Sequence, residues 1–250
     1  MSELDVHVES DYVDYIKYTE NRISLSTSGF ENEIKELYEL LYLFSSNIDI
    51  YQDLDKKSFM WEYISETKND LIISFDLLNI NYLTASKRIL RSAIESFFRF
   101  SLCFSRFKEY SQNKENNIYN VTDNLKELKS MTDTHKVGKM TFYTKNYFSN
   151  TIINKQVDGL YNKYSSLSSS VHVNSKTSFS PQRFLNEYSS VKNEDVSKNI
   201  KIYRDILIDM LLSLYYFDSW LSSSTFTKRS ILKLELIGGE YAKAYFDQYD

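Results

Sequence analysis

Glycine and proline are scarce, with only 5 glycines and 1 proline in 250 residues. Sheet folds with many tight turns need glycine for positive φ and proline for fixed φ. A chain that nearly lacks both residues favours long helices with few connections. Hydrophobic residues make up 42% and charged residues 26% of the sequence, which is ordinary for a folded protein with a buried core.

Aromatic residues are unusually common, with 21 tyrosines and 16 phenylalanines. Much of the core must therefore consist of rings, and each buried tyrosine hydroxyl needs a hydrogen-bond partner. Aromatic side chains are also enriched in protein interfaces. We therefore expect an aromatic-rich helical face that binds a protein partner or a second copy of the chain.

Apolar residues recur at steps of three and four along most of the chain, as in amphipathic helices. This spacing predicts helices over residues 4–25, 30–48, 57–78, 82–107, 118–131, 151–171, 196–221 and 228–247. The polar tract 111–117 predicts a loop, and the segment 132–150 shows no clear period and is expected to be irregular. Gly238 and Gly239 interrupt the last predicted helix.

These patterns predict an all-α fold with a single helical-bundle domain. We expect residues 1–55 to form N-terminal helices that pack on the core, and residues 56–221 to form the central bundle. Its central helices are predicted at 82–107, 151–171 and 196–221. Residues 222–250 then form a C-terminal helical extension after a serine-rich hinge.

Charge and cysteine content exclude several classes of protein. The net charge of -4 gives no general attraction to nucleic acid or to anionic membranes, so RNA binding would need a local basic patch. A single cysteine, Cys103, excludes a disulfide framework and a cysteine-rich zinc site. His7, His135 and His172 lack the spacing of metal ligands. We expect no metal, no cofactor, no membrane span and a cytoplasmic location.

A stripe of charged residues follows the predicted helix 82–107, on the face opposite its aromatic side chains. One interpretation is a solvated face with ion pairs that contribute about 0.3–0.5 kcal/mol each. The other is a cleft between helices, where the planar guanidinium suits a carboxylate or phosphate better than lysine does. The stripe consists of Arg88, Arg91, Glu95, Arg99 and Arg106.

His172 follows the predicted helix 151–171 and would lie on its polar edge with Tyr161, Ser165 and Ser168. A histidine changes charge near neutral pH, which suits general acid–base chemistry. It could equally be a structural residue that interacts with the last carbonyls of a helix or with a buried tyrosine or glutamate. Packing of the two helices predicts one cluster of Arg91, Glu95 and His172, within about 4–6 Å through direct or water-bridged contacts.

Two segments carry a resemblance to a known family. Arg88-Ile-Leu-Arg91-Ser-Ala-Ile-Glu95 resembles the helix motif of bacterial all-helical proteins of the DUF5677 kind. Tyr164-x-x-Leu167-Ser168-x-x-Val171-His172-x-x-Ser175 resembles their downstream motif. These proteins are similar to HEPN domains and abortive-infection proteins, many of which are ribonucleases of toxin or anti-phage systems. The resemblance spans about residues 55–220 and implies a HEPN-like fold and a defence function.

The chain departs from the family at one point. Catalytic HEPN ribonucleases carry an arginine separated from the histidine by four to six residues, where this chain has Ser165, Ser166 and Leu167. Arg91 or Arg88 could replace that arginine only if the two helices pack side by side.

Two functions from different classes therefore remain open, both within a bacterial defence or toxin–antitoxin system. The first is a metal-independent ribonuclease. There His172 is the general acid or base, Arg91 and Arg88 stabilise charge on the phosphate, and Glu95 orients one of these groups. The second is a non-catalytic helical module that senses or binds a protein in a phage-defence assembly, or neutralises a toxin as an antitoxin does.

Overall fold

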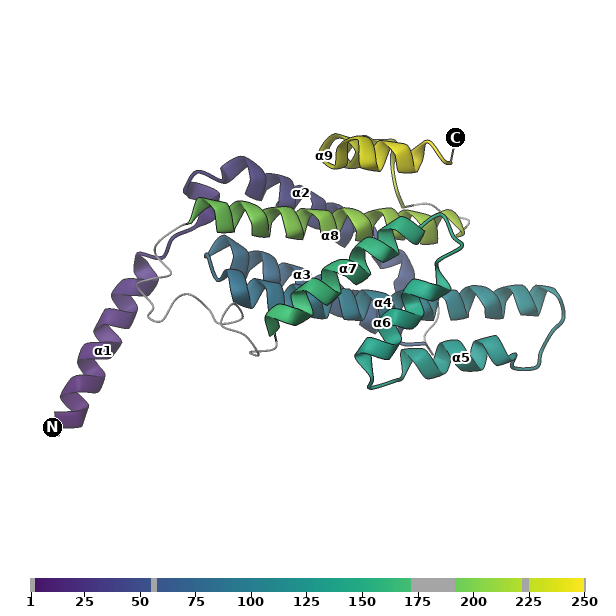
Figure 1. The fold of residues 1–250 in the computed structure, drawn as a ribbon, viewed down its shortest axis with the longest axis horizontal. Coiled ribbons are helices and arrows are strands. Elements are labelled where there is room, and N and C mark those ends of the chain that lie inside the picture. The colour runs from purple at the N-terminus through teal and green to yellow at the C-terminus, as the bar shows by residue number, and fades with distance from the viewer. Residues whose placement is uncertain (1–2, 55–57, 172–191, 222–224, 250) are drawn as a thin grey trace.

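The computed structural model describes residues 3–54, 58–171, 192–221 and 225–249, and every regular element within these ranges is helical (Figure 1). The all-α prediction is therefore confirmed. Two short 3-10 helices, η1 Leu25–Thr27 and η2 Asp49–Gln52, flank α2. The α-helices are α1 Glu3–Glu20, α2 Glu31–Ser46, α3 Met60–Asn79, α4 Leu83–Glu115, α5 Asp123–Thr132, α6 Val137–Tyr147, α7 Asn154–Val171, α8 Asn193–Ser219 and α9 Lys228–Phe246.

The hairpin of α3 and α4 forms the base of the bundle. Asn81 takes a left-handed conformation (φ 64°) between the two helices, which reverses the chain within a few residues. Ser74 of α3 and Ser86 of α4 are buried and hydrogen-bond to each other, and the Ser86 hydroxyl also donates to the Ser74 carbonyl at 2.8 Å. These contacts fix the register of the two helices close to the turn.

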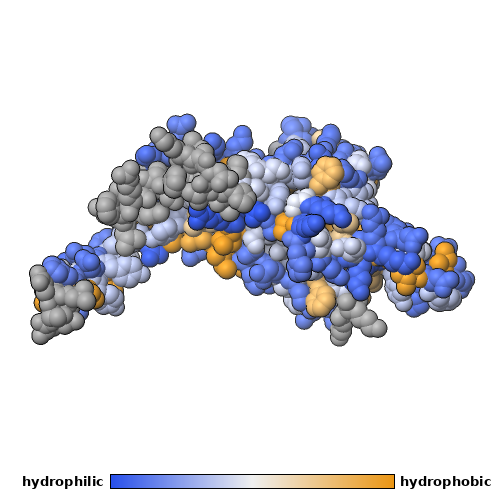
Figure 2. All heavy atoms as spheres, turned by 60° about the horizontal axis from the view of Figure 1, so that its bottom comes forward, coloured by the Kyte–Doolittle hydropathy of each residue, from blue (hydrophilic) through white to orange (hydrophobic). Residues whose placement is uncertain are grey.

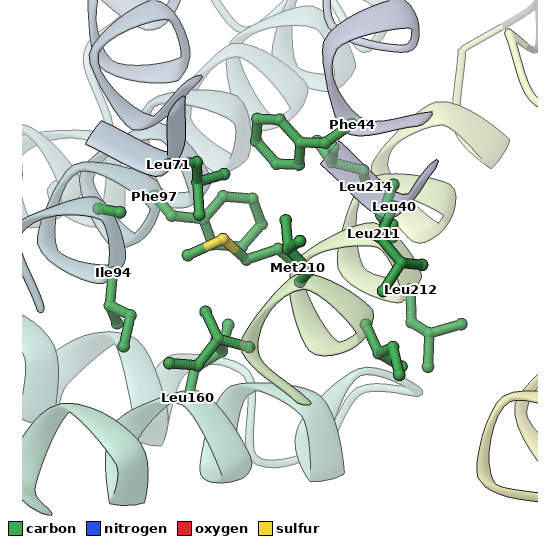
Figure 3. Close-up of a cluster of buried hydrophobic side chains, with 14 of the residues drawn as sticks. Leu40, Phe44, Leu71, Ile94, Phe97, Leu160, Met210, Leu211, Leu212 and Leu214 are labelled. Atoms are coloured by element: carbon green, nitrogen blue, oxygen red, sulfur yellow. The ribbon is translucent and has the colours of Figure 1, made fainter. Parts of the chain in front are cut away.

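The main core lies where α8 meets α2, α3, α4 and α7 (Figure 3). Met210 of α8 points between Leu71 of α3 and Phe97 of α4, and Leu160 of α7 approaches from another side. A buried tyrosine of α8, Tyr203, donates its hydroxyl to the Leu71 carbonyl at 2.5 Å. The buried ring thus keeps the hydrogen bond that its hydroxyl requires.

A cluster of rings continues the core toward the end of α8. Phe104 of α4 packs against Phe217 and Trp220, with ring centroids 4.9 and 6.1 Å away. On the same helix Cys103 is buried, and its Sγ lies 2.9 Å from the Ser58 carbonyl oxygen. The expectation of an aromatic core is met in this part of the bundle.

Two predictions about local structure were wrong. Residues 111–115 continue α4, because Gln, Lys and Glu favour a helix without needing burial; the helix stops before Asn117, where φ is 58°. Residues 137–147 form α6 within the segment expected to be irregular. Its buried positions include Thr141 and Thr144, whose hydroxyls donate to carbonyls of the preceding turn, so the apolar period is interrupted in the sequence.

The two ends of the chain differ in how they meet the bundle. Within the expected N-terminal segment 1–55, α2 packs against α8 and α3, whereas α1 projects from the body (Figure 1). The end of α1 is held by the Tyr18 hydroxyl, 2.9 Å from that of Tyr82. Within the expected extension 222–250, α9 buries Leu234 and Tyr245 and joins the same hydrophobic core as the central bundle.

Candidate functional site

The candidate site is the seam between α4 and α7, where one arginine contacts three side chains. Arg91 of α4 donates from Nε to the Ser168 hydroxyl at 2.8 Å and from Nη2 to the Tyr164 hydroxyl at 3.0 Å. Its guanidinium also lies over the Tyr164 ring, 4.9 Å from the centroid. On its own helix, Arg91 Nη2 is 2.8 Å from Glu95 Oε1. The guanidinium therefore joins the two helices at a fixed orientation.

Burial determines the electrostatics of this pair. The side chains of Arg91 and Glu95 are 22% and 19% exposed, so neither belongs to the solvated face that was one interpretation of the stripe. Burial raises the pKa of the Glu95 carboxyl, and the charges of Arg91 and Arg99 oppose that rise. A partly buried carboxylate held by a guanidinium can stabilise the cation's position and its charge.

A second carboxyl, Asp70 of α3, lies behind Glu95 and was missed by the sequence reasoning. Asp70 is 8% exposed, and burial raises its pKa while a hydrogen bond with Ser92 acts in the opposite direction. Its charge also raises the pKa of Glu95, as expected for like charges. The signal was present in the sequence, because Asp70 interrupts the apolar stripe that contains Ile64 and Leu71.

The other arginines of the stripe lie in three different environments. Arg88 is exposed. Arg99 donates to the carbonyls of Thr132 and Thr134 at the end of α5, where a cation offsets the partial negative charge of a helix C-terminus. Arg106 lies farther along α4 and lines a separate groove. The stripe is thus divided among several sites rather than gathered in one cleft.

His172 lies outside the described residues. It follows Val171, the last residue of α7, and is four residues after Ser168. The predicted three-residue cluster of Arg91, Glu95 and His172 therefore stays a prediction. Of its members, the structure brings Arg91 and Glu95 together, and Arg91 reaches the last turn of α7.

A second charged cluster joins α7, α8 and α9 and was also missed by the sequence reasoning. The buried carboxylate of Asp209 accepts from Lys163 Nζ at 2.8 Å and from the Tyr241 hydroxyl at 2.7 Å. A Cβ at Gly159 would lie 2.6 Å from Asp209 Oδ2, so glycine is required for this close approach. The cluster borders a cavity of about 490 Å³. Both carboxylate oxygens of Asp209 have hydrogen-bond partners, so the cluster stabilises the packing of the three helices.

Neither cluster suits a metal ion, and over the described ranges no three His, Cys, Asp or Glu side chains are grouped so that they could hold one. In the same ranges no helix combines the length and apolar character needed to span a bilayer. Comparison of the chain with protein-family models, curated proteins and solved structures finds no match.

Proposed function

We propose that the protein is a HEPN-like helical component of a bacterial defence or toxin–antitoxin system, acting in the cytoplasm as a metal-independent ribonuclease. His172, Arg91 and Glu95 carry the reaction, with Arg88 as a second cation. The observation that supports this proposal best is the contact of Arg91 with Ser168. Catalytic members of the family carry an arginine four to six residues before the histidine, where this chain has Ser165, Ser166 and Leu167. Arg91 of α4 supplies a guanidinium to the next residue, Ser168.

The chemistry requires a base, an acid and a cation. His172 removes the proton from a ribose 2′-hydroxyl, whose oxygen then bonds to the adjacent phosphorus. The bond from phosphorus to the 5′ oxygen breaks, and that oxygen takes a proton from the imidazolium or from water. Arg91 stabilises the negative charge that builds on the non-bridging oxygens. Glu95 is a positioning residue, because it holds the guanidinium of Arg91.

Replacement of His172 by Ala tests this assignment. We expect the variant to lose cleavage of a single-stranded RNA in the presence of a chelator, and to lose toxicity to growing cells, with little change in melting temperature. The matched control is His135→Ala, since His135 is exposed and lies on the connection between α5 and α6. Cleavage that survives in His172→Ala would refute the catalytic role of this histidine.

A second candidate is the non-catalytic module that binds a protein partner. It is favoured by the contacts that Arg91 already makes within the bundle, since its Nε and Nη2 face Ser168, Tyr164 and Glu95. In that case the network is structural, and His172→Ala leaves phage protection or toxicity intact. If the imidazole is a buried partner of the network, the same change lowers the unfolding free energy by about 1–3 kcal/mol.

A further inference from the structure

The N-terminal helix α1 leaves a face with six exposed apolar side chains without a partner in the described structure. Every side chain from Val6 to Lys17 is exposed, and Tyr12, for example, retains 58% of its surface. At 100° per residue the apolar side chains fall on one half of the helix. They are Val6, Val8, Tyr12, Val13, Tyr15 and Ile16.

The charge of α1 restricts what can cover this face. The helix contains six carboxylates and one lysine. Glu9 lies near the middle of the apolar half of the helical wheel, and Asp11 and Asp14 lie on the opposite half. A surface that covers this half of α1 must therefore be apolar and must also carry basic side chains that can reach Glu9.

A groove with this character lies at the far end of the same molecule. It runs between the second half of α4 and α5 and has a volume of about 860 Å³. Its apolar side chains include Tyr110 and Val121, which are 61% and 64% exposed. Three basic residues and one acidic residue surround them, namely Arg106, Lys114, Lys129 and Asp133. Figure 2 shows hydrophobic surface at this end of the body.

The α1 of the same chain cannot reach this groove as a helix. The base of α1 is tied to Tyr82 at the start of α4, and the groove begins at Arg106 on the same helix. At 1.5 Å per residue, the distance along α4 from Tyr82 to the groove is about 36 to 48 Å. The 18 residues of α1 extend only about 27 Å, and Figure 1 shows α1 at the end of the molecule opposite to α5 and the second half of α4.

We propose that α1 docks in the groove between α4 and α5 of a second copy of this chain, so that two copies exchange their N-terminal helices. When two elongated copies lie antiparallel, the α1 of each meets the groove of the other. A single helix face buries less than the roughly 800 Å² per partner of a stable interface. The reciprocal arrangement doubles that area and satisfies both exposed faces in one closed dimer.

Light scattering of the full chain tests the dimer. We expect a dimer that dissociates in Tyr12→Asp and in Val121→Asp, with the helical circular dichroism signal retained because both side chains are exposed on the single chain. Tyr42→Asp on α2 is the matched control, since Tyr42 is 65% exposed and lies on neither surface. A chain that is monomeric at every concentration, or a dimer that both variants leave intact, would overturn the proposal.

Reversal of one charge on α1 and of one charge in the groove tests whether these two surfaces contact each other. Glu9→Lys on α1 and Lys114→Glu in the groove should each weaken dimerisation about tenfold, since each affects two symmetric contacts. The variant with both changes should recover most of the affinity. Equal weakening in the single variants without recovery in the double variant would contradict a direct contact between α1 and the groove.

Cross-linking identifies the contacting segments. The native Cys103 is buried, so we expect disulfides to form only between the engineered thiols. A mixture of Tyr12→Cys and Val121→Cys proteins should form a disulfide between the two variants, and neither variant should cross-link to itself. A disulfide within Tyr12→Cys alone would show that two α1 helices pair with each other and would overturn the proposal. A monomer whose groove binds single-stranded RNA through Lys114 would overturn it as well. Ribonuclease activity is measured separately, so either proposal can fail without the other.

Discussion

Replacement of Arg91 by Met measures how far the seam between α4 and α7 depends on one guanidinium. Met keeps much of the apolar stem and removes the charge together with the hydrogen bonds to Ser168 and Tyr164. Loss of one partner from a buried ion pair costs about 3–5 kcal/mol, whereas an exposed pair contributes about 0.2–1 kcal/mol. Since Arg91 and Glu95 keep 22% and 19% exposure, we expect a loss of about 2–3 kcal/mol at pH 7.

The loss should depend on pH because Glu95 remains without its counterion. Burial already raises the pKa of Glu95, and Arg91 is the main group that opposes this rise; the variant therefore has a higher pKa still. A carboxyl with a raised pKa binds its proton more tightly in the folded state. Its contribution to stability is thus most favourable below the unfolded pKa and declines as the pH rises through the folded pKa. The cost of Arg91→Met should be smaller at pH 4 than at pH 7.

Urea unfolding followed by circular dichroism at both pH values gives this difference directly. At pH 7 the melting temperature should fall by about 4–12 °C. Arg88→Met is the matched control, because Arg88 is an exposed arginine of the same helix and should change stability by less than about 0.5 kcal/mol. Adding Glu95→Gln to Arg91→Met should recover part of the loss at pH 7. An equal cost at pH 4 and pH 7 would refute the electrostatic part of the reasoning.

Further predictions concern close contacts within the bundle. Gly159→Ala should lower the unfolding free energy by about 0.5–2 kcal/mol, because the clash of its Cβ, 2.6 Å from Asp209 Oδ2, outweighs the gain of alanine over glycine within a helix. Gly138→Ala is the paired control in the first turn of α6, where no other part of the described structure lies within 4 Å of the new Cβ, and it should leave stability unchanged or raise it by less than about 0.5 kcal/mol. Tyr203→Phe removes the hydrogen bond to the Leu71 carbonyl and should cost about 0.5–1.5 kcal/mol. Urea unfolding of each variant measures these values, and a stabilised Gly159→Ala protein would contradict the predicted clash.

Helices with long apolar stripes were predicted well from the sequence. The stripe of α8 predicted residues 196–221, close to Asn193–Ser219 in the structure, because burial on one face leaves a clear period of 3.6 residues. The same reasoning missed α6, where Thr141 and Thr144 are buried while their hydroxyls bond to carbonyls of their own helix. A search for the helical spacing of apolar residues misses buried positions that are occupied by threonine.

The site was only partly predictable. The four-residue spacing allowed Glu95 to pair with Arg91 or with Arg99 and favoured Arg99, whereas the structure pairs Glu95 with Arg91. The contact of Arg91 with Ser168 depends on how α4 and α7 cross, which single-helix patterns do not specify. Asp70 belongs to α3, and its place beside Glu95 follows from tertiary packing. Sequence patterns thus indicate which residues share a helix face, and the packing of helices decides which faces meet.

The reactivity of the single buried thiol, Cys103, can report local opening of the bundle. Cys103 lies beneath the segment that contains Ser58, with its Sγ 2.9 Å from the carbonyl oxygen of that residue. An alkylating reagent can modify this thiol only when the segment moves away or the bundle unfolds. A labelling rate faster than global unfolding would therefore report transient local opening at the contact between Cys103 and Ser58. Because the chain has one cysteine, every modified molecule records that event at a known place.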